Sequence, residues 1–198
     1  MKDTWQNTWG FFTEADALIF DEWAKDVPSN GVIVELGSLL GRSAGALCTA
    51  LERNGKTGVT VYCIDRWPLV GQDHSWCKQF PRLWTDYKGN PMAAFVVNTM
   101  SCRPVPKIMQ YDVRVAARLF KPGSVWAVYI DADHSYDGMV QTIPAWWPRI
   151  VTGGRLGGHD YCSEWPGVVQ AVDETFQTAI ARYGISWEAR KPTQAFAI

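Results

Sequence analysis

The sequence predicts a single α/β domain whose doubly wound, mostly parallel sheet of seven strands has helices on both faces. Three observations lead to this fold class. Short apolar, β-branched runs alternate with segments of helical periodicity along the 198 residues, and no linker divides them. Glycine turns or acidic residues follow several of these runs. The last two extended runs, 186–190 and 194–198, are separated by Lys191-Pro192-Thr193, which indicates a C-terminal antiparallel hairpin.

The first third of the chain predicts a lead-in helix followed by one βαβ unit. Residues 1–30 contain the lead-in helix, which begins after the cap residue Thr13. The glycine-bounded apolar run 32–34 is typical of a strand buried on both faces. A helical stripe over 43–53 and a second apolar run over 59–64 complete the unit.

The region 66–100 breaks this regularity with prolines, glycines and scattered aromatic residues, among them His74 and Tyr87, although 92–99 has helical character. We interpret it as an insertion that covers the substrate. Regular elements then resume with three more strands of the doubly wound sheet and their helices. The predicted strands are near 108–109, 125–130 and 155–158, and the predicted helices are 113–120, 136–147 and 168–183.

The composition excludes several classes of function. Lys and Arg total 19 against 20 Asp and Glu, with a net charge of -1 and no basic cluster, so a nucleic-acid partner is not expected. The five cysteines are scattered and form no C-x-x-C pair, which argues against a disulfide framework and a zinc knuckle. No apolar run approaches the roughly 18 residues of a membrane span. We therefore expect a cytoplasmic protein with a small-molecule substrate and no membrane partner.

Eleven tryptophans are unusual for a chain of this length. Several stand in segments that otherwise look like loops or chain ends, where they could line a pocket or pack at a subunit contact such as that of a homodimer. These residues are Trp5, Trp9, Trp67, Trp76 and Trp84.

Function is expected at the carboxyl ends of the parallel strands, because ligands of doubly wound sheets bind there. After the first strand comes the turn Glu35-Leu36-Gly37-Ser38-Leu39-Leu40-Gly41-Arg42-Ser43. Gly37 permits a close backbone approach, and Gly41 lets the chain enter a helix whose free N–H groups can bind a carboxylate. After the second strand stands Asp65, placed to accept hydrogen bonds from ribose hydroxyls. A glycine turn followed by a distal acid indicates a ligand that contains a nucleoside.

The glycine pattern of the turn distinguishes a dinucleotide from a nucleoside with an amino-acid tail. It is G-x-x-x-G and lacks G-x-G-x-x-G, so Ser38 and Leu39 stand where backbone would meet a pyrophosphate. A nucleoside with an amino-acid tail suits it better, and Glu35 would bind the tail's ammonium group or anchor the loop. An NAD-dependent oxidoreductase is one alternative, and a non-catalytic nucleoside-binding module that acts through its tryptophan-rich surface is another.

Four segments in chain order resemble motifs of the class I S-adenosylmethionine-dependent methyltransferases, which have a Rossmann-like fold. Among them the chain is similar to small O-methyltransferases related to the macrocin and catechol O-methyltransferase groups. The resemblance implies S-adenosylmethionine as cofactor and in-line transfer of its methyl group to the hydroxyl of a small molecule. The four segments are 35–43, Ile64-Asp65-Arg66-Trp67, 129–136 and 153–161.

The resemblance also assigns the contacts to the cofactor. Ser43 would help to hold the methionine carboxylate, and the adenine would lie near 109–112, at the end of the third strand. The full set that it implies is Glu35, Gly37, Ser38, Gly41, Ser43, Asp65, Arg66, Asp112 and Asp131.

Acidic and histidine residues follow the fourth and fifth predicted strands, and we expect all five side chains to converge beside the cofactor's methyl group. They are Asp131, Asp133, His134, His159 and Asp160.

Metal-dependent relatives use an Asp after the fourth strand and an acidic pair after the fifth. The resemblance thus implies Mg²⁺ or another divalent cation, with Asp131, Asp133, His159 and Asp160 as its ligands. The imidazole of His159 departs from the oxygen ligands that Mg²⁺ prefers. Without a metal, His134 or His159 would act as general base next to Asp160.

Overall fold

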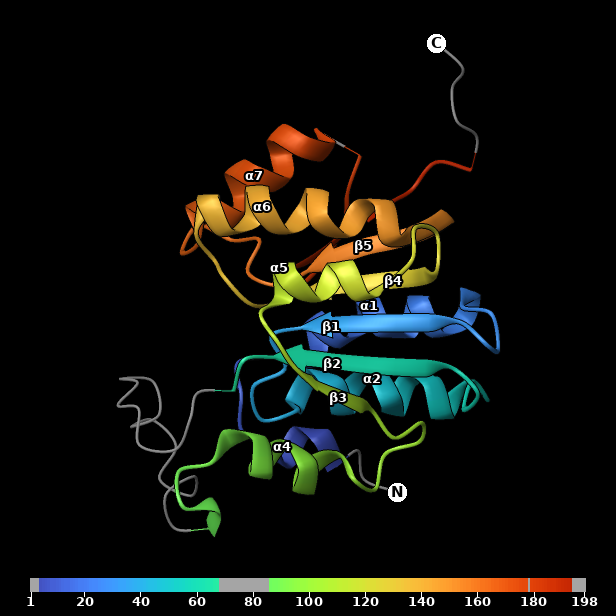
Figure 1. Cartoon of the computed structure of the whole chain (residues 1–198), viewed down its shortest axis with the longest axis vertical. Helices are drawn as coiled ribbons and strands as arrows, with labels where there is room; N and C mark the ends of the chain where they lie inside the picture. The colour runs from blue at the N-terminus through green and yellow to red at the C-terminus, as the bar shows by residue number, and fades with distance from the viewer. Residues whose placement is uncertain (1–3, 68–85, 178, 194–198) are drawn as a thin grey trace.

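A seven-stranded sheet runs through the part of the chain that the computed structural model describes, namely residues 4–67, 86–177 and 179–193. Its strands are β1 (Val32–Leu36), β2 (Thr60–Asp65), β3 (Lys107–Gln110), β4 (Val125–Ile130), β5 (Ile150–Gly158), β6 (Ala181–Tyr183) and β7 (Ser186–Arg190). Their order is β3-β2-β1-β4-β5-β7-β6 (Figure 1). Strands β1 to β5 pair in parallel, whereas β7 pairs antiparallel with both β5 and β6. The predicted fold class is confirmed.

Helices cover both faces of the sheet. The bounds are η1 (Thr4–Asn7), α1 (Glu14–Asp26), α2 (Arg42–Arg53), α4 (Pro91–Thr99), α5 (Val113–Ala116), α6 (Tyr136–Trp146) and α7 (Pro166–Phe176). Helices α1 and α2 lie on one face, and α5, α6 and α7 lie on the other (Figure 1). Within the described residues, no helix is both long and apolar enough to cross a membrane.

Side chains that point alternately to the two faces of the central strands divide the core into two layers. In β4, Ala127 and Tyr129 pack into the cluster that contains α1 and α2, while Val128 and Ile130 pack into the cluster beneath α6 and α7. Successive side chains of a strand point to opposite faces, so a strand covered on both sides must be apolar throughout. All six residues of β4 are buried.

Helix α1 begins where the sequence predicts. The Oδ2 of Asp16 accepts the N–H of Thr13 at 2.9 Å, and the Oγ1 of Thr13 accepts the N–H of Asp16 at 3.4 Å. This reciprocal pair satisfies two N–H groups that the first turn of a helix leaves without partners.

The C-terminal hairpin corrects the prediction. Helix α7 ends at Phe176 rather than at 183, and β6 (Ala181–Tyr183) turns back onto β7 (Ser186–Arg190). The turn contains Gly184 with φ +59°, where an added Cβ would lie 2.5 Å from Oδ1 of Asp16. Packing against α1 therefore selects a strand in a segment that has helical periodicity. The run 194–198, predicted as the partner strand, lies outside the described residues.

Candidate active site

A cavity of about 1250 Å³ opens at the carboxyl ends of the parallel strands. It lies where the strand order reverses, since β1 has β2 on one side and β4 on the other. Ligand sites usually measure about 300 to 1,000 Å³, so this cavity is larger than one small ligand needs. The predicted site residues that line it are Gly37, Ser38, Ser43, Asp65, Arg66, Asp112, Asp131, Asp133, His134, His159 and Asp160.

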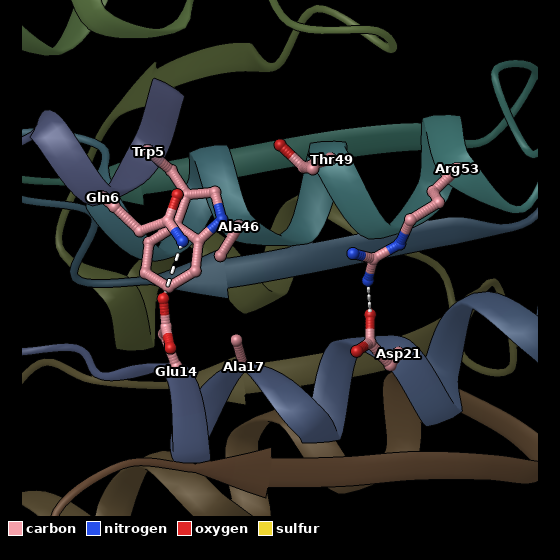
Figure 2. Close-up of a pocket in the computed structure, with 8 residues that line it drawn as sticks. All are labelled: Trp5, Gln6, Glu14, Ala17, Asp21, Ala46, Thr49 and Arg53. Carbon is pink, nitrogen blue, oxygen red and sulfur yellow. Dashed lines mark hydrogen bonds and ion pairs between the residues drawn. The ribbon is translucent and has the colours of Figure 1, made fainter. Parts of the chain in front are cut away.

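A second pocket, of about 170 Å³, lies between η1, α1 and α2 (Figure 2). Four of its polar side chains are paired with one another. Gln6 donates to Glu14 at 2.8 Å, and Arg53 forms an ion pair with Asp21. The pocket is smaller than the sites that usually hold ligands, which leaves the larger cavity as the candidate site.

The two glycines of the turn after β1 are required by packing within the protein. Gly37 has φ +86°, and a Cβ there would lie 1.9 Å from the carbonyl oxygen of Asp131. Gly41 is the N-cap of α2 with φ +89°, and its Cβ would lie 2.7 Å from Cγ2 of Thr99. The close approach that Gly37 permits is thus made by the chain after β4, and Gly41 provides the expected entry into the helix.

Glu35, in β1, is fully buried behind this turn. Neither of its carboxylate oxygens has a hydrogen-bond partner of good geometry among the described residues, and the Oγ of Ser38 also lacks one. Burial raises the pKa of Glu35 to about 7, and the neighbouring Ser38 and Ser43 limit the rise. Buried polar atoms without partners are rare in native structures, so these atoms indicate that a ligand or water is needed here.

Asp65 joins the turn after β1 to the chain after β2. Its Oδ2 accepts the N–H of Leu39 at 2.9 Å, and its Oδ1 accepts the N–H of Trp67 at 2.8 Å. Burial raises the pKa of Asp65, and these hydrogen bonds oppose the rise. Each carboxylate oxygen can accept a further hydrogen bond, so Asp65 can still bind a ligand from the cavity.

Asp112, at the end of β3, is engaged with Arg114. It caps α5, and its Oδ2 lies 3.1 Å from Nη2 of Arg114, which lowers the pKa of Asp112. Arg66 is largely exposed, with Nη1 4.0 Å from Oδ2 of Asp112. These three side chains form the charged end of the cavity.

The loops after β4 and β5 bring together Asp131, His134 and Asp160. The Nε2 of His134 lies 2.8 Å from Oδ2 of Asp160 and 3.5 Å from Oδ1 of Asp131. One ligand atom of each residue lies within 4.8 Å of the others. Burial would lower the pKa of His134, but contacts with the two carboxylates raise it to about 9. The two histidines lower the pKa of Asp160 despite its burial.

His159 is enclosed between Asp16 and Asp160. Its Nε2 lies 3.3 Å from Oδ2 of Asp16, and its Nδ1 lies 3.2 Å from Oδ1 of Asp160. Burial would lower the pKa of His159, but the two acids raise it to about 10. Asp16 reaches the site from α1, and the sequence offers no signal for this contact beyond the capping pattern.

Asp133 is the exception to the expected convergence of five side chains. Its Oδ1 accepts hydrogen bonds from the N–H and the hydroxyl of Ser135, at 3.0 and 2.7 Å. Ser135 is the N-cap of α6, so Asp133 is held at the start of that helix. The structure brings the other four together.

The tryptophans divide between core and cavity. Trp5 and Trp67 are buried in the hydrophobic core, whereas Trp9 lines the cavity. Trp76 and Trp84, together with His74, lie outside the described residues. Among the cavity residues that the sequence did not identify as site residues are Phe11, Arg42 and Trp165.

Fold and site together define a Rossmann-like α/β protein with a large cavity at the switch point of its sheet. A family model described as "Methyltransferase domain" matches residues 34–161, which is more than half of the chain. The chain therefore belongs to this family of S-adenosylmethionine-dependent methyltransferases, and the family favours methyl transfer over the oxidoreductase alternative. No curated protein matches the chain by sequence.

Solved structures of O-methyltransferases share the fold. The O-methyltransferase NovP is 17% identical, with a TM-score of 0.64 over 90% of this chain and 80% of NovP. CalS11, a TDP-rhamnose 3'-O-methyltransferase of calicheamicin biosynthesis, is 18% identical, with a TM-score of 0.61 over 88% of this chain and 78% of its own. An S-adenosylmethionine-dependent O-methyltransferase from Thermotoga maritima is 13% identical, with a TM-score of 0.57 over 96% and 69%.

Proposed function

We propose that this chain transfers the methyl group of S-adenosylmethionine to a hydroxyl group of a small molecule. One observation carries the proposal. A single cavity joins the turn after β1, which has unsatisfied buried polar atoms behind it, to the cluster of Asp131, His134 and Asp160. The first feature suits the cofactor, and the second suits an acceptor that must lose a proton.

The methionine end of the cofactor would lie against Ser38, Ser43 and the first turn of α2. Free N–H groups at that helix N-terminus favour a carboxylate. Glu35 lies behind Ser38, and its buried carboxylate would complement the ammonium group. A buried acid without a partner is stabilised when a positive charge comes near it.

The nucleoside would extend from this turn across the ends of β2 and β3. Asp65 would accept the ribose hydroxyls with the lone pairs that Leu39 and Trp67 leave free. Arg66 and Asp112 would flank the adenine. This arrangement would leave the sulfonium methyl near Asp131, whose negative charge favours the cation.

The acceptor hydroxyl would lie beside Asp131, His134 and Asp160. Two carboxylates and one imidazole within 4.8 Å fit a divalent cation, and this mixed donor set suits Mn²⁺ better than Mg²⁺. A cation held there would lower the pKa of the acceptor hydroxyl and orient it. In the absence of a metal, the neutral form of His134 would take the hydroxyl proton, because His134 reaches both carboxylates and lines the cavity. Its pKa of about 9 makes this form scarce at neutral pH, so methyl transfer by this route should become faster as pH rises toward 9.

His159 would act on Asp160 rather than on the acceptor. Only 3% of its side chain is exposed, and both ring nitrogens face acids. Held in this way, His159 would keep Asp160 oriented toward His134. Alignment of the hydroxyl oxygen with the sulfonium methyl would then supply much of the rate.

Calorimetry and product analysis test the proposal together. We expect S-adenosylhomocysteine to bind and NAD⁺ not to bind. We also expect incubation with S-adenosylmethionine and a library of hydroxyl compounds to give a product with one added methyl group. Binding of NAD⁺ alone would contradict the proposal. Cofactor binding without transfer to any acceptor would favour the non-catalytic module.

A further inference from the structure

The turn after β1 contains a leucine in a backbone conformation that favours glycine. The N–H of Gly41 donates to the carbonyl of Ser38 at 2.8 Å, which closes a turn with Leu39 and Leu40 at its centre. Leu39 has φ +44°. A positive φ at this position of a turn is usually adopted by Gly, Asn or Asp, because a larger side chain is strained there. Contacts with the rest of the protein are therefore needed to hold Leu39 in this conformation.

Trp67 holds the carbonyl group of Leu39. The indole Nε1 of Trp67 donates to this carbonyl at 2.7 Å, while Oδ2 of Asp65 accepts the N–H of Leu39 at 2.9 Å. The ring of Trp67 is buried and packs against the ring of Phe95, with the centroids 5.1 Å apart. Both polar backbone groups of Leu39 are thus paired with side chains at and after the end of β2.

Asn98, in α4, holds the next carbonyl group of the turn. Its Nδ2 donates to the carbonyl of Leu40 at 2.9 Å. Thr99 and Phe95 of the same helix approach Gly41 so closely that an added Cβ there would lie 2.7 and 3.0 Å from their side chains. Helix α4 therefore supports the turn at the point where α2 begins.

Trp67 and Asn98 act on the turn from outside the cavity. Leu39 and Leu40 line the cavity, whereas Trp67 and Asn98 are not among the described residues that line it. A substitution at either position would therefore remove no predicted contact with a ligand. It would change the conformation of the turn, which carries Ser38 and leads into the first turn of α2.

Both residues belong to the region 66–100, which is predicted from the sequence to cover the substrate. Trp67 stands at the start of this region, and Asn98 lies in the helix at its end. The described ends of the region therefore support the turn that would hold the cofactor. This is a role in addition to any contact with the substrate.

Preorganisation connects these contacts to the affinity for the cofactor. A turn that already has its binding conformation loses little freedom when the ligand binds. If only a fraction of the molecules has that conformation, the apparent affinity falls by the same fraction. Leu39 is strained, so its turn should leave the binding conformation more often once a hydrogen bond that holds it is lost.

We propose that Trp67 and Asn98 are positioning residues for S-adenosylmethionine. Their side-chain N–H groups hold the carbonyl groups of Leu39 and Leu40 and keep the turn in its binding conformation before the cofactor arrives. This inference rests on the proposed function, because it concerns the cofactor of the same cavity.

The affinity for S-adenosylhomocysteine, measured by calorimetry, tests the two assignments. Trp67→Phe keeps an aromatic ring against Phe95 and removes the indole N–H. Asn98→Ala removes the amide at a helix position that tolerates alanine. We expect each variant to bind S-adenosylhomocysteine about fivefold more weakly, as for the loss of one net hydrogen bond. Affinity within about twofold of the original protein would overturn the assignment of that residue.

The matched controls are Trp23→Phe and Asn54→Ala. Trp23 is buried and donates its indole N–H to Oε2 of Glu188 at 2.6 Å, and Asn54, after the end of α2, donates to the carbonyl of Ala50 at 2.9 Å. These variants lose the same groups without touching the turn, so their affinity should stay within about twofold. A loss in the controls equal to that in the test variants would overturn the inference, because any loosening of the fold would then suffice.

Amide hydrogen exchange in the cofactor-free protein adds a readout that needs no ligand. The N–H groups of Leu39 and Gly41 should exchange faster in Trp67→Phe and Asn98→Ala than in the original protein and the two controls. A residue that only stabilises the fold would lower the melting temperature without this local change. Unchanged exchange in the turn, together with weaker binding, would show that the two residues do not act through the turn.

Failure of this inference is distinguishable from failure of the proposed function. If the variants lose affinity for S-adenosylhomocysteine but the original protein methylates no acceptor, the proposed function fails and the positioning roles stand. If the original protein transfers methyl groups and the variants keep their affinity, the proposed function stands and the positioning roles fail. Absence of S-adenosylhomocysteine binding to the original protein would overturn both.

Discussion

The Nε2 of His134 lies 2.8 Å from Oδ2 of Asp160, and this contact joins the loops after β4 and β5 across the candidate site. The Oδ1 of Asp131 lies 3.5 Å from the same nitrogen. Two carboxylates and an imidazole from two loops thus lie close enough together to bind one cation.

We predict that Mn²⁺ binds to this cluster. Calorimetry of the metal-free protein should show one site, and Asp160→Asn should weaken it by at least about tenfold, since even the residues that support metal ligands matter by 10- to 100-fold. Asp133→Asn is the matched control, because Asp133 is bound to Ser135 instead. Absence of Mn²⁺ binding, with methyl transfer unaffected by a chelator, would contradict the metal site and leave neutral His134 as the base, with a rate that rises toward pH 9.

Asp65→Ala should weaken the affinity for S-adenosylhomocysteine by at least about tenfold, because a carboxylate acceptor for the ribose is lost. Asp65 also holds the N–H groups of Leu39 and Trp67, so the alanine variant loosens the turn as well. Asp65→Asn keeps one acceptor oxygen and should lose less. Equal affinity of the alanine variant and the original protein would refute the ribose assignment.

Glu35 should make stability fall as pH rises. Its pKa in the folded protein is about 7 against an ordinary value of 4.5, so between these values the folded state holds a proton that the unfolded state has lost. Below pH 4.5 the carboxyl group is protonated in both states. Above pH 7 it is ionised in both states, and the folded state then contains a buried charge. The free energy of unfolding should drop by about 3 kcal/mol across this window.

The matched variant for this prediction is Glu35→Gln, which keeps the shape and removes the titration. Urea denaturation of both proteins at pH 5 and pH 8, without cofactor, gives the comparison. We expect the variant to gain stability relative to the original protein at pH 8. A difference that does not change with pH would show that Glu35 titrates normally.

Asp16→Asn should destabilise the fold by about 2 kcal/mol. Asp16 caps α1 through Thr13, accepts the N–H of Ile185 at 2.9 Å and faces His159. The control is Glu22→Gln on the same helix, where an exposed ion pair with Lys25 contributes little. Chemical denaturation measures both, and equal stabilities of the two variants would contradict the central position assigned to Asp16.

Much of the fold could be predicted because it depends on local patterns. Strand β4 is apolar at every position, which predicts burial on both faces, and Thr13 with Asp16 predicts the start of α1. Gly41 needs a positive φ that few other residues adopt. The location of the site followed as well, since the carboxyl ends of parallel strands meet at one edge of the sheet.

The rest depended on contacts between distant residues. Strand β6 forms in a segment of helical periodicity because α1 packs against Gly184. His134 rather than Asp133 joins Asp131 and Asp160, because Ser135 holds Asp133 at the start of α6. Local periodicity determined which residues reach the strand ends. Only tertiary packing decided which side chains meet there, because their positions depend on loop conformations and on partners far along the chain.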